Sequence, residues 1–219
     1  MNKAFIFDMD GVLIDSEPVW EKYEREYLPQ FFGKEVAEKM GNLVGLGVND
    51  LMDRALALGA VFDRKEYLEK ADKIAKLVYA QSAITVGVEH LADQLTETGF
   101  KLGLVSQSPH NWIDQVVPRL PFNKRLNVIV SLHDHPELKR KPEPDGFIEA
   151  LRLLNTKPEH SIILEDSNLG IQAAKAAHIY TIGFRGNLVK GYEQTGADAY
   201  ADTMDEVIRL IEARSEELR

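Results

Sequence analysis

The chain has 219 residues, of which 44% are hydrophobic and 28% charged, a composition that excludes disordered, collagen-like and coiled-coil proteins. It contains no cysteine, which excludes disulfides, zinc-thiolate sites and thiol nucleophiles. Its formal net charge of −9 disfavours nucleic acids and anionic membranes as partners, because both are negatively charged.

The first predicted element is a strand at residues 4–7, a short apolar run of the kind buried on both faces of a parallel sheet. It meets Asp8 before the apolar region of a signal peptide could form, and no later run is long enough to span a membrane. We therefore expect a cytoplasmic protein without a membrane or nucleic-acid partner. We also expect a monomer.

The stretch that follows, residues 17–81, has helical periodicity and no clear strand. Trp20, Tyr23 and Tyr27 share one face of its first helix. A block of helices at this place in the chain predicts an inserted α-helical cap. We assign residues 17–82 to the cap, and residues 1–16 and 83–219 to the core.

Short apolar runs then alternate with amphipathic stretches to the end of the chain. Further strands are predicted at residues 102–105, 128–130, 162–164 and 180–183, and helices at 88–98, 110–117, 144–155, 169–177 and 204–213. Strands that alternate with helices of this length are typical of βαβ units. The predicted fold is α/β, with a Rossmann-like parallel sheet as the core.

Carboxylates follow two of these strands. Asp8 and Asp10 come after the first, and Glu165 and Asp166 after the run at 162–164. Parallel α/β sheets build their sites at the carboxyl ends of the strands, so the two pairs are expected to converge. Like charges a few ångströms apart repel by about 4 kcal/mol at an effective dielectric of 20. The oxygen ligands therefore favour Mg²⁺, which also binds substrate phosphate.

Three further polar residues follow predicted strands. Ser106 and Gln107 precede a helix, where hydroxyl and amide groups can bind an anion, and Lys141 lies in a proline-stiffened basic cluster. Taken singly, Ser106 could be a helix cap, Lys141 part of a solvated loop, and the Asp8–Asp10 pair an acidic turn. Their occurrence at successive strand ends favours one site for a phosphorylated metabolite.

These residues resemble the motifs of the haloacid dehalogenase-like hydrolase superfamily, in its branch with a helical cap. Residues 7–17, FDMDGVLIDSE, are similar to the whole first motif. Ser106 stands at the second motif, Lys141 at the third and Glu165-Asp166 at the fourth. The resemblance covers essentially the whole chain. One departure is His178, which stands where the family usually has a glycine after a helix.

The resemblance implies a phosphatase that works through an aspartyl-phosphate. Asp8 would be the nucleophile, and Asp10 would protonate the leaving oxygen and then activate water. Lys141 would neutralise the phosphoryl oxygens while Ser106 and neighbouring amides hydrogen-bond them. This implies a catalytic set of Asp8, Asp10, Ser106 and Lys141.

The same resemblance implies a magnesium site and a substrate pocket. Mg²⁺ would be held by Asp8, Asp166 and the backbone carbonyl of Asp10, with Glu165 in support. We expect the substrate to contact Gly11, Gln107, Gly45 and Trp20, the last two from the cap.

Two alternatives to a phosphatase stay open. Mutases similar to β-phosphoglucomutase carry a histidine shortly after the first motif and an arginine in a cap loop, to hold a second phosphate. Here Trp20 takes the first place and the loop at 44–50 has no arginine, which favours a phosphatase. A non-catalytic protein that binds a phosphorylated ligand is the other alternative, but mere binding does not need Asp10.

Overall fold

The structure is a computed structural model and describes residues 2–217. Its centre is a six-stranded parallel sheet with the strand order β5-β4-β1-β6-β7-β8. The strands are β1 (Lys3–Phe7), β4 (Phe100–Ser106), β5 (Leu126–Ser131), β6 (Ser161–Glu165), β7 (Tyr180–Phe184) and β8 (Ala199–Ala201). The predicted α/β class with a parallel sheet is confirmed, and β8 is a strand that the sequence did not indicate.

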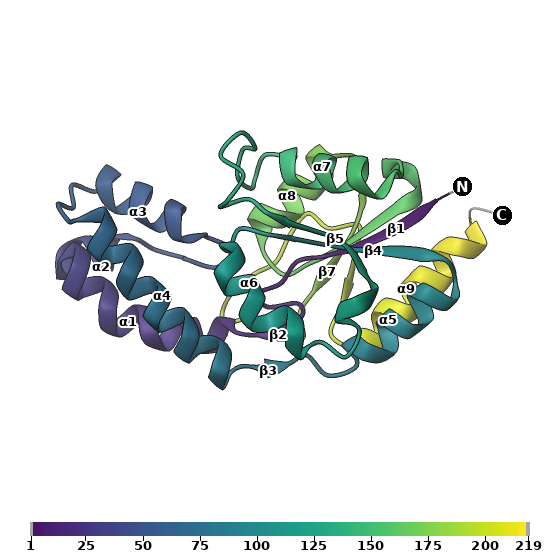
Figure 1. The fold of residues 1–219 in the computed structure, drawn as a ribbon, viewed down its shortest axis with the longest axis horizontal. Helices are drawn as coiled ribbons and strands as arrows, with labels where there is room; N and C mark the ends of the chain where they lie inside the picture. The colour runs from purple at the N-terminus through teal and green to yellow at the C-terminus, as the bar shows by residue number, and fades with distance from the viewer. Residues whose placement is uncertain (1, 218–219) are drawn as a thin grey trace.

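Helices cover both faces of the sheet (Figure 1). Phe5 and Phe7 of β1 pack in the same buried cluster as residues of α5 (Val88–Glu97) and α9 (Met204–Glu217). Ala4 and Ile6 point to the opposite face, where α7 (Asp145–Leu154) and α8 (Asn168–Ala176) pack. All four side chains are fully buried, which explains why β1 is apolar throughout instead of alternating with polar residues.

Four helices lie in the chain between β1 and α5, and Figure 1 shows them gathered at one end of the molecule. They are α1 (Glu17–Phe32), α2 (Lys34–Lys39), α3 (Val48–Ala57) and α4 (Arg64–Gln81). Aromatic rings pack α1 against α4, with Phe32 of α1 and Tyr67 of α4 at a centroid distance of 4.9 Å. This group coincides with the stretch in which the sequence predicts helices.

The chain enters and leaves the helical group through a small two-stranded sheet. β2 (Ile14–Asp15) and β3 (Ala83–Ile84) pair antiparallel, so the outgoing and returning segments are hydrogen-bonded to each other. The remaining elements are α6 (His110–Val116) and the 3-10 helices Val117–Arg119, Asn123–Arg125 and Pro158–His160. Because α6 follows β4 and packs on α4, it connects the sheet with the helical group.

The backbone at His178 and the character of the helices are two further features of the fold. His178 has a φ of 58°, so a non-glycine residue takes the left-handed conformation after α8. Within residues 2–217, the structure contains no helix with the length and apolar character needed to cross a bilayer.

Candidate active site

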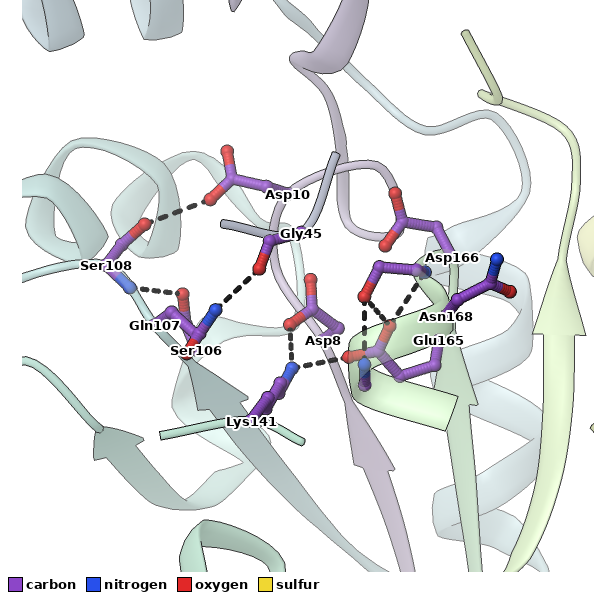
Figure 2. Close-up of polar contacts among 12 residues, drawn as sticks. Asp8, Asp10, Gly45, Ser106, Gln107, Ser108, Lys141, Glu165, Asp166 and Asn168 are labelled. Atoms are coloured by element: carbon purple, nitrogen blue, oxygen red, sulfur yellow. Dashed lines mark hydrogen bonds and ion pairs between the residues drawn. The ribbon is translucent and has the colours of Figure 1, made fainter. Parts of the chain in front are cut away.

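The predicted site residues meet at the carboxyl edge of the sheet. Asp8 directly follows β1, Ser106 ends β4, and Glu165 ends β6. β1 pairs with both β4 and β6, so these three residues end adjacent strands. Figure 2 shows Lys141 reaching between Asp8 and Glu165 from the loop that follows β5. The parallel topology thus brings together residues that are far apart in the sequence.

Lys141 is the central cation of this cluster. Its Nζ donates to Asp8 Oδ1 at 2.6 Å and also to Glu165 Oε1, and its side chain is only 3% exposed. Burial alone would lower the pKa of Lys141, but the two carboxylates outweigh burial and hold it above its usual range, so the group is an ammonium. Burial raises the pKa of Asp8 to about 8, opposed by Lys141 and reinforced by Glu165.

Asp10 is held by hydroxyl and indole groups. Its Oδ1 accepts from Ser16 Oγ at 2.6 Å and from Trp20 Nε1 at 3.4 Å. Its Oδ2 accepts from Ser108 Oγ at 3.0 Å and from Tyr79 OH at 3.3 Å. Burial raises the pKa of Asp10 even against these donors, which favour the ionised form. The carboxyl group therefore lies beside the helical group, which supplies Trp20 and Tyr79.

Of the four acids expected at a metal, two keep an oxygen without a hydrogen bond. Asp166 Oδ2 is buried without a hydrogen-bond partner in residues 2–217, and Asp8 uses only Oδ1 toward Lys141. Glu165 has both oxygens engaged, because Oε2 accepts from the backbone N–H and the hydroxyl of Ser167 at 2.9 and 3.0 Å. Within the described residues, no group of three or more His, Cys, Asp or Glu side chains is arranged to hold a metal ion.

The absence of a side chain at Gly11 leaves space for the carboxylate of Asp166. Its φ is +72°, and a Cβ at this position would overlap the Asp166 carboxylate. The backbone of Gly11 is itself bonded, since its N–H donates to Ile14 and its carbonyl accepts from Asn187. Gly11 therefore makes room for Asp166 and does not line the pocket described next.

A pocket opens above Asp8 between the sheet edge and the helical group. It is lined by Asp8, Asp10, Ser106, Gln107, Lys141, Asp166, Trp20 and Gly45, and also by residues that the sequence did not single out, among them Glu17, Glu24 and Ser108. Gln107 Nε2 donates to the carbonyl of Gly45 at 2.5 Å (Figure 2). A Cβ on Gly45 would lie 2.5 Å from Cβ of Ser167, so this loop lies directly on the strand ends.

The aromatic face of α1 has two roles. Trp20 stacks on Trp112 of α6 at a centroid distance of 5.3 Å, with an edge contact to Tyr79 at 5.9 Å. It also lines the pocket, so it packs between helices and is exposed to the cavity, while its contact with a substrate stays a prediction. Tyr27 lines the pocket as well and packs against Tyr67.

Three of the four donors to Asp10 were not identified from the sequence. Ser16 lies inside the motif-like stretch at 7–17, and Ser108 stands two residues after Ser106, so the sequence places both close to predicted site residues. Tyr79 lies 69 residues from Asp10, and its contact depends on how α4 packs. No local pattern could have indicated it.

A substitution at Gly170 tests how closely the chain packs around the Glu165 carboxylate that binds Lys141. A glycine-to-alanine change inside a helix usually stabilises by about 0.5–1 kcal/mol. A Cβ at position 170 of α8 would overlap the Glu165 carboxylate, which is fully buried and already bonded. We expect Gly170→Ala to lower the free energy of unfolding by about 1–3 kcal/mol, measured by urea denaturation. Gln172→Ala, on the exposed side of the same helix, is the control; a stabilised Gly170→Ala protein would contradict the packing described here.

Comparisons with known proteins are consistent with this geometry. The family model described as haloacid dehalogenase-like hydrolase matches residues 5–184. The chain is 29% identical over 196 residues to validoxylamine A 7'-phosphate phosphatase of Streptomyces hygroscopicus subsp. limoneus, covering 84% of this chain and 85% of that protein. It is 26% identical over 232 residues to beta-phosphoglucomutase of Bacillus subtilis, covering 99% and 97%. The crystal structure of CbbY from Rhodobacter sphaeroides in complex with phosphate superposes with a TM-score of 0.74 at 23% identity, covering 94% and 96%.

Proposed function

The chain belongs to the haloacid dehalogenase-like hydrolase family, and we propose that it is a magnesium-dependent phosphatase that hydrolyses a small phosphomonoester through a phosphoryl group carried on Asp8. Phosphoric monoester hydrolysis is also the activity in the name of its phosphatase relative. The observation that carries the proposal is the placement of Asp8. One of its oxygens lies 2.6 Å from the buried ammonium of Lys141. Asp8 also lines a pocket whose other walls include residues of the helical group.

In the first step, a carboxylate oxygen of Asp8 attacks the phosphorus. The bond between phosphorus and the leaving oxygen breaks, and Asp10 gives that oxygen a proton. In the second step Asp10 takes a proton from water, the water oxygen attacks the phosphorus, and phosphate leaves Asp8. The raised pKa of Asp10 supports this role, because its carboxyl group must be protonated when the leaving oxygen needs a proton.

Asp8, Asp166 and the backbone carbonyl of Asp10 would hold Mg²⁺, which neutralises charge on the phosphoryl oxygens. The fit rests on Asp166 Oδ2, a buried acceptor without a hydrogen-bond partner in residues 2–217. Glu165 would act in support by fixing Lys141, since both of its oxygens are engaged. Gly11 contributes by leaving space for Asp166.

Residues 17–82 act in this proposal as a cap over a core of residues 1–16 and 83–219. Ser106, at the end of β4, would donate a hydrogen bond to the phosphoryl group, since its Oγ accepts only from the backbone N–H of Ser108 in the described chain. Gln107, Gly45 and Trp20 would enclose the leaving group. The contact between Gln107 and Gly45 supports a closed cap that keeps bulk water from the phosphoryl group.

A phosphomutase is the second candidate, and the likeness to beta-phosphoglucomutase over nearly the whole chain favours it. The pocket argues against it, because among its described lining residues Lys141 is the only cation and is bound to Asp8 and Glu165. Incubation of the purified protein with Mg²⁺ and β-glucose 1-phosphate separates the two candidates. We expect free phosphate and glucose; accumulation of glucose 6-phosphate would establish the mutase.

Ser108→Ala tests the acid role of Asp10 through pH dependence. The hydroxyl of Ser108 favours the ionised form of Asp10, so its removal raises the pKa of that carboxyl further. Phosphorylation of Asp8 needs protonated Asp10 and therefore falls as the pH rises through this pKa. We expect the alkaline limb of kcat/KM for an alkyl phosphomonoester to move to higher pH by about one pH unit.

The control for this profile is Ser161→Ala, which removes another buried hydroxyl at the amino end of β6, bonded to the carbonyl of Lys157. It is expected to leave the limb in place. A limb that stays fixed or moves to lower pH in Ser108→Ala would rule out Asp10 as the proton donor.

A further inference from the structure

The cap side of the pocket presents two carboxyl groups without hydrogen-bond partners in residues 2–217. Glu17 and Glu24 lie seven positions apart on α1, on the same face as Trp20, and both line the pocket above Asp8. Neither side chain forms a hydrogen bond or an ion pair with any residue in the range 2–217. A ligand in the pocket would therefore meet two acceptors that the protein leaves unused.

Gln107 adds a third acceptor on the core side. The residue is 9% exposed, and its Nε2 donates to the carbonyl of Gly45, which can only accept. The orientation of the amide is therefore fixed, and its Oε1 is buried with no hydrogen-bond partner in the described chain. A buried acceptor without a donor costs about 1–3 kcal/mol, and a donor brought by a ligand would recover it.

Among the described residues that line the pocket, there is also no cation that could meet a second negative group. Lys141 is bound to Asp8 and Glu165, and lies at the phosphoryl end. The neighbouring groove beside α1 contains Arg25, which is paired with Glu21. Burial raises the pKa of Glu24 to about 7, with Glu21 adding to the effect, and burial together with Asp10 and Glu24 raises the pKa of Glu17 well above its usual range. A hydrogen-bond donor or a positive charge beside either glutamate would therefore be favourable.

We infer that Glu17, Glu24 and Gln107 select a leaving group that donates hydrogen bonds and carries no second anionic group: a polyol or an amino-polyol. This inference rests on the proposed phosphatase function and names its substrate class. Hydroxyl and ammonium groups share the donor chemistry that the three acceptors need. A leaving group with a carboxylate or a second phosphate would meet the two glutamates with no cation to compensate them.

The test compares kcat/KM for sorbitol 6-phosphate, a neutral polyol phosphate, and 2-phosphoglycolate, which carries a carboxylate. We expect the polyol phosphate to be preferred at least about tenfold. Glu24→Lys is expected to reduce or invert that preference. Glu26→Lys makes the same charge change on an exposed position of α1 outside the pocket, and is expected to leave the preference unchanged.

A second pair of substrates separates the two kinds of donor. If glucosamine 6-phosphate is preferred to glucose 6-phosphate and Glu24→Gln removes the preference, the donor recognised is an ammonium; equal rates identify hydroxyl groups. A preference for 2-phosphoglycolate, or an unchanged ratio in Glu24→Lys, overturns the inference while leaving the phosphatase intact. Failure to release phosphate from p-nitrophenyl phosphate with Mg²⁺ overturns the proposed function, and the inference with it.

Discussion

Asp8→Asn is expected to abolish turnover, lowering kcat by a factor on the order of 10⁴ or more. The amide has nearly the size of the carboxylate and can still accept a hydrogen bond from Lys141, so the fold should be retained. It lacks the nucleophilic carboxylate oxygen, and no phosphoryl group can be carried at position 8. Phosphate release from a phosphomonoester with Mg²⁺ measures the effect.

Asp114→Asn makes the same substitution on the exposed surface of α6 and is expected to keep full activity. Because an asparagine can slowly hydrolyse back to aspartate, Asp8→Ala should be measured beside it and be at least as inactive. Activity in both position-8 variants close to that of the parent would remove Asp8 from the mechanism.

Lys141→Met is expected to cost both stability and activity. The methionine keeps an unbranched side chain but removes the positive charge between Asp8 and Glu165, whose side chains are 10% and 0% exposed. Breaking a buried ion pair by removing one partner costs about 3–5 kcal/mol, because the other charges stay buried without compensation. Loss of one group that neutralises the phosphoryl oxygens should lower kcat by about 10²–10³-fold.

Urea denaturation and phosphate release measure the two effects separately. Lys139→Met removes an exposed lysine two residues earlier and is the matched control, expected to change neither. If Lys141→Met does not fold, Lys141→Arg keeps the charge with a different geometry and is expected to fold with lowered kcat. A Lys141→Met protein as stable and active as the parent would contradict the role given to this side chain.

The sheet and the acidic edge could be predicted because both depend on local patterns. The run at 4–7 is apolar on both faces, and the structure covers both faces of β1 with helices. Parallel strands end at one edge, so Asp8 and Asp166 were expected at the same edge once the strands were recognised, and the pairing of β1 with β6 places them on adjacent strands. Among the helices, 88–98 and 169–177 lie within one residue of the observed bounds.

What the sequence did not reveal depends on contacts between distant segments. β8 is three residues long and follows the polar residue Asp198. A strand this short does not show the hydrophobic pattern by which strands are recognised in a sequence. Tyr79 reaches Asp10 only because α4 packs across α6. Glu17 ends the motif-like stretch and Glu24 lies on the aromatic face of α1, yet only the folded chain shows that both line the pocket. In the sequence, glutamates at these positions of a helix look like ordinary solvent-exposed residues.

The central claim is that a phosphoryl group is carried on Asp8. Its most direct test is to mix the protein with Mg²⁺ and a phosphomonoester, quench in acid within one turnover, and map the mass of the peptide that contains residues 2–17. We expect the mass of one phosphoryl group on Asp8 and none in Asp8→Asn. Phosphate release at the normal rate with no phosphorylated peptide at any quench time, or a phosphoryl group on another residue, would contradict the mechanism.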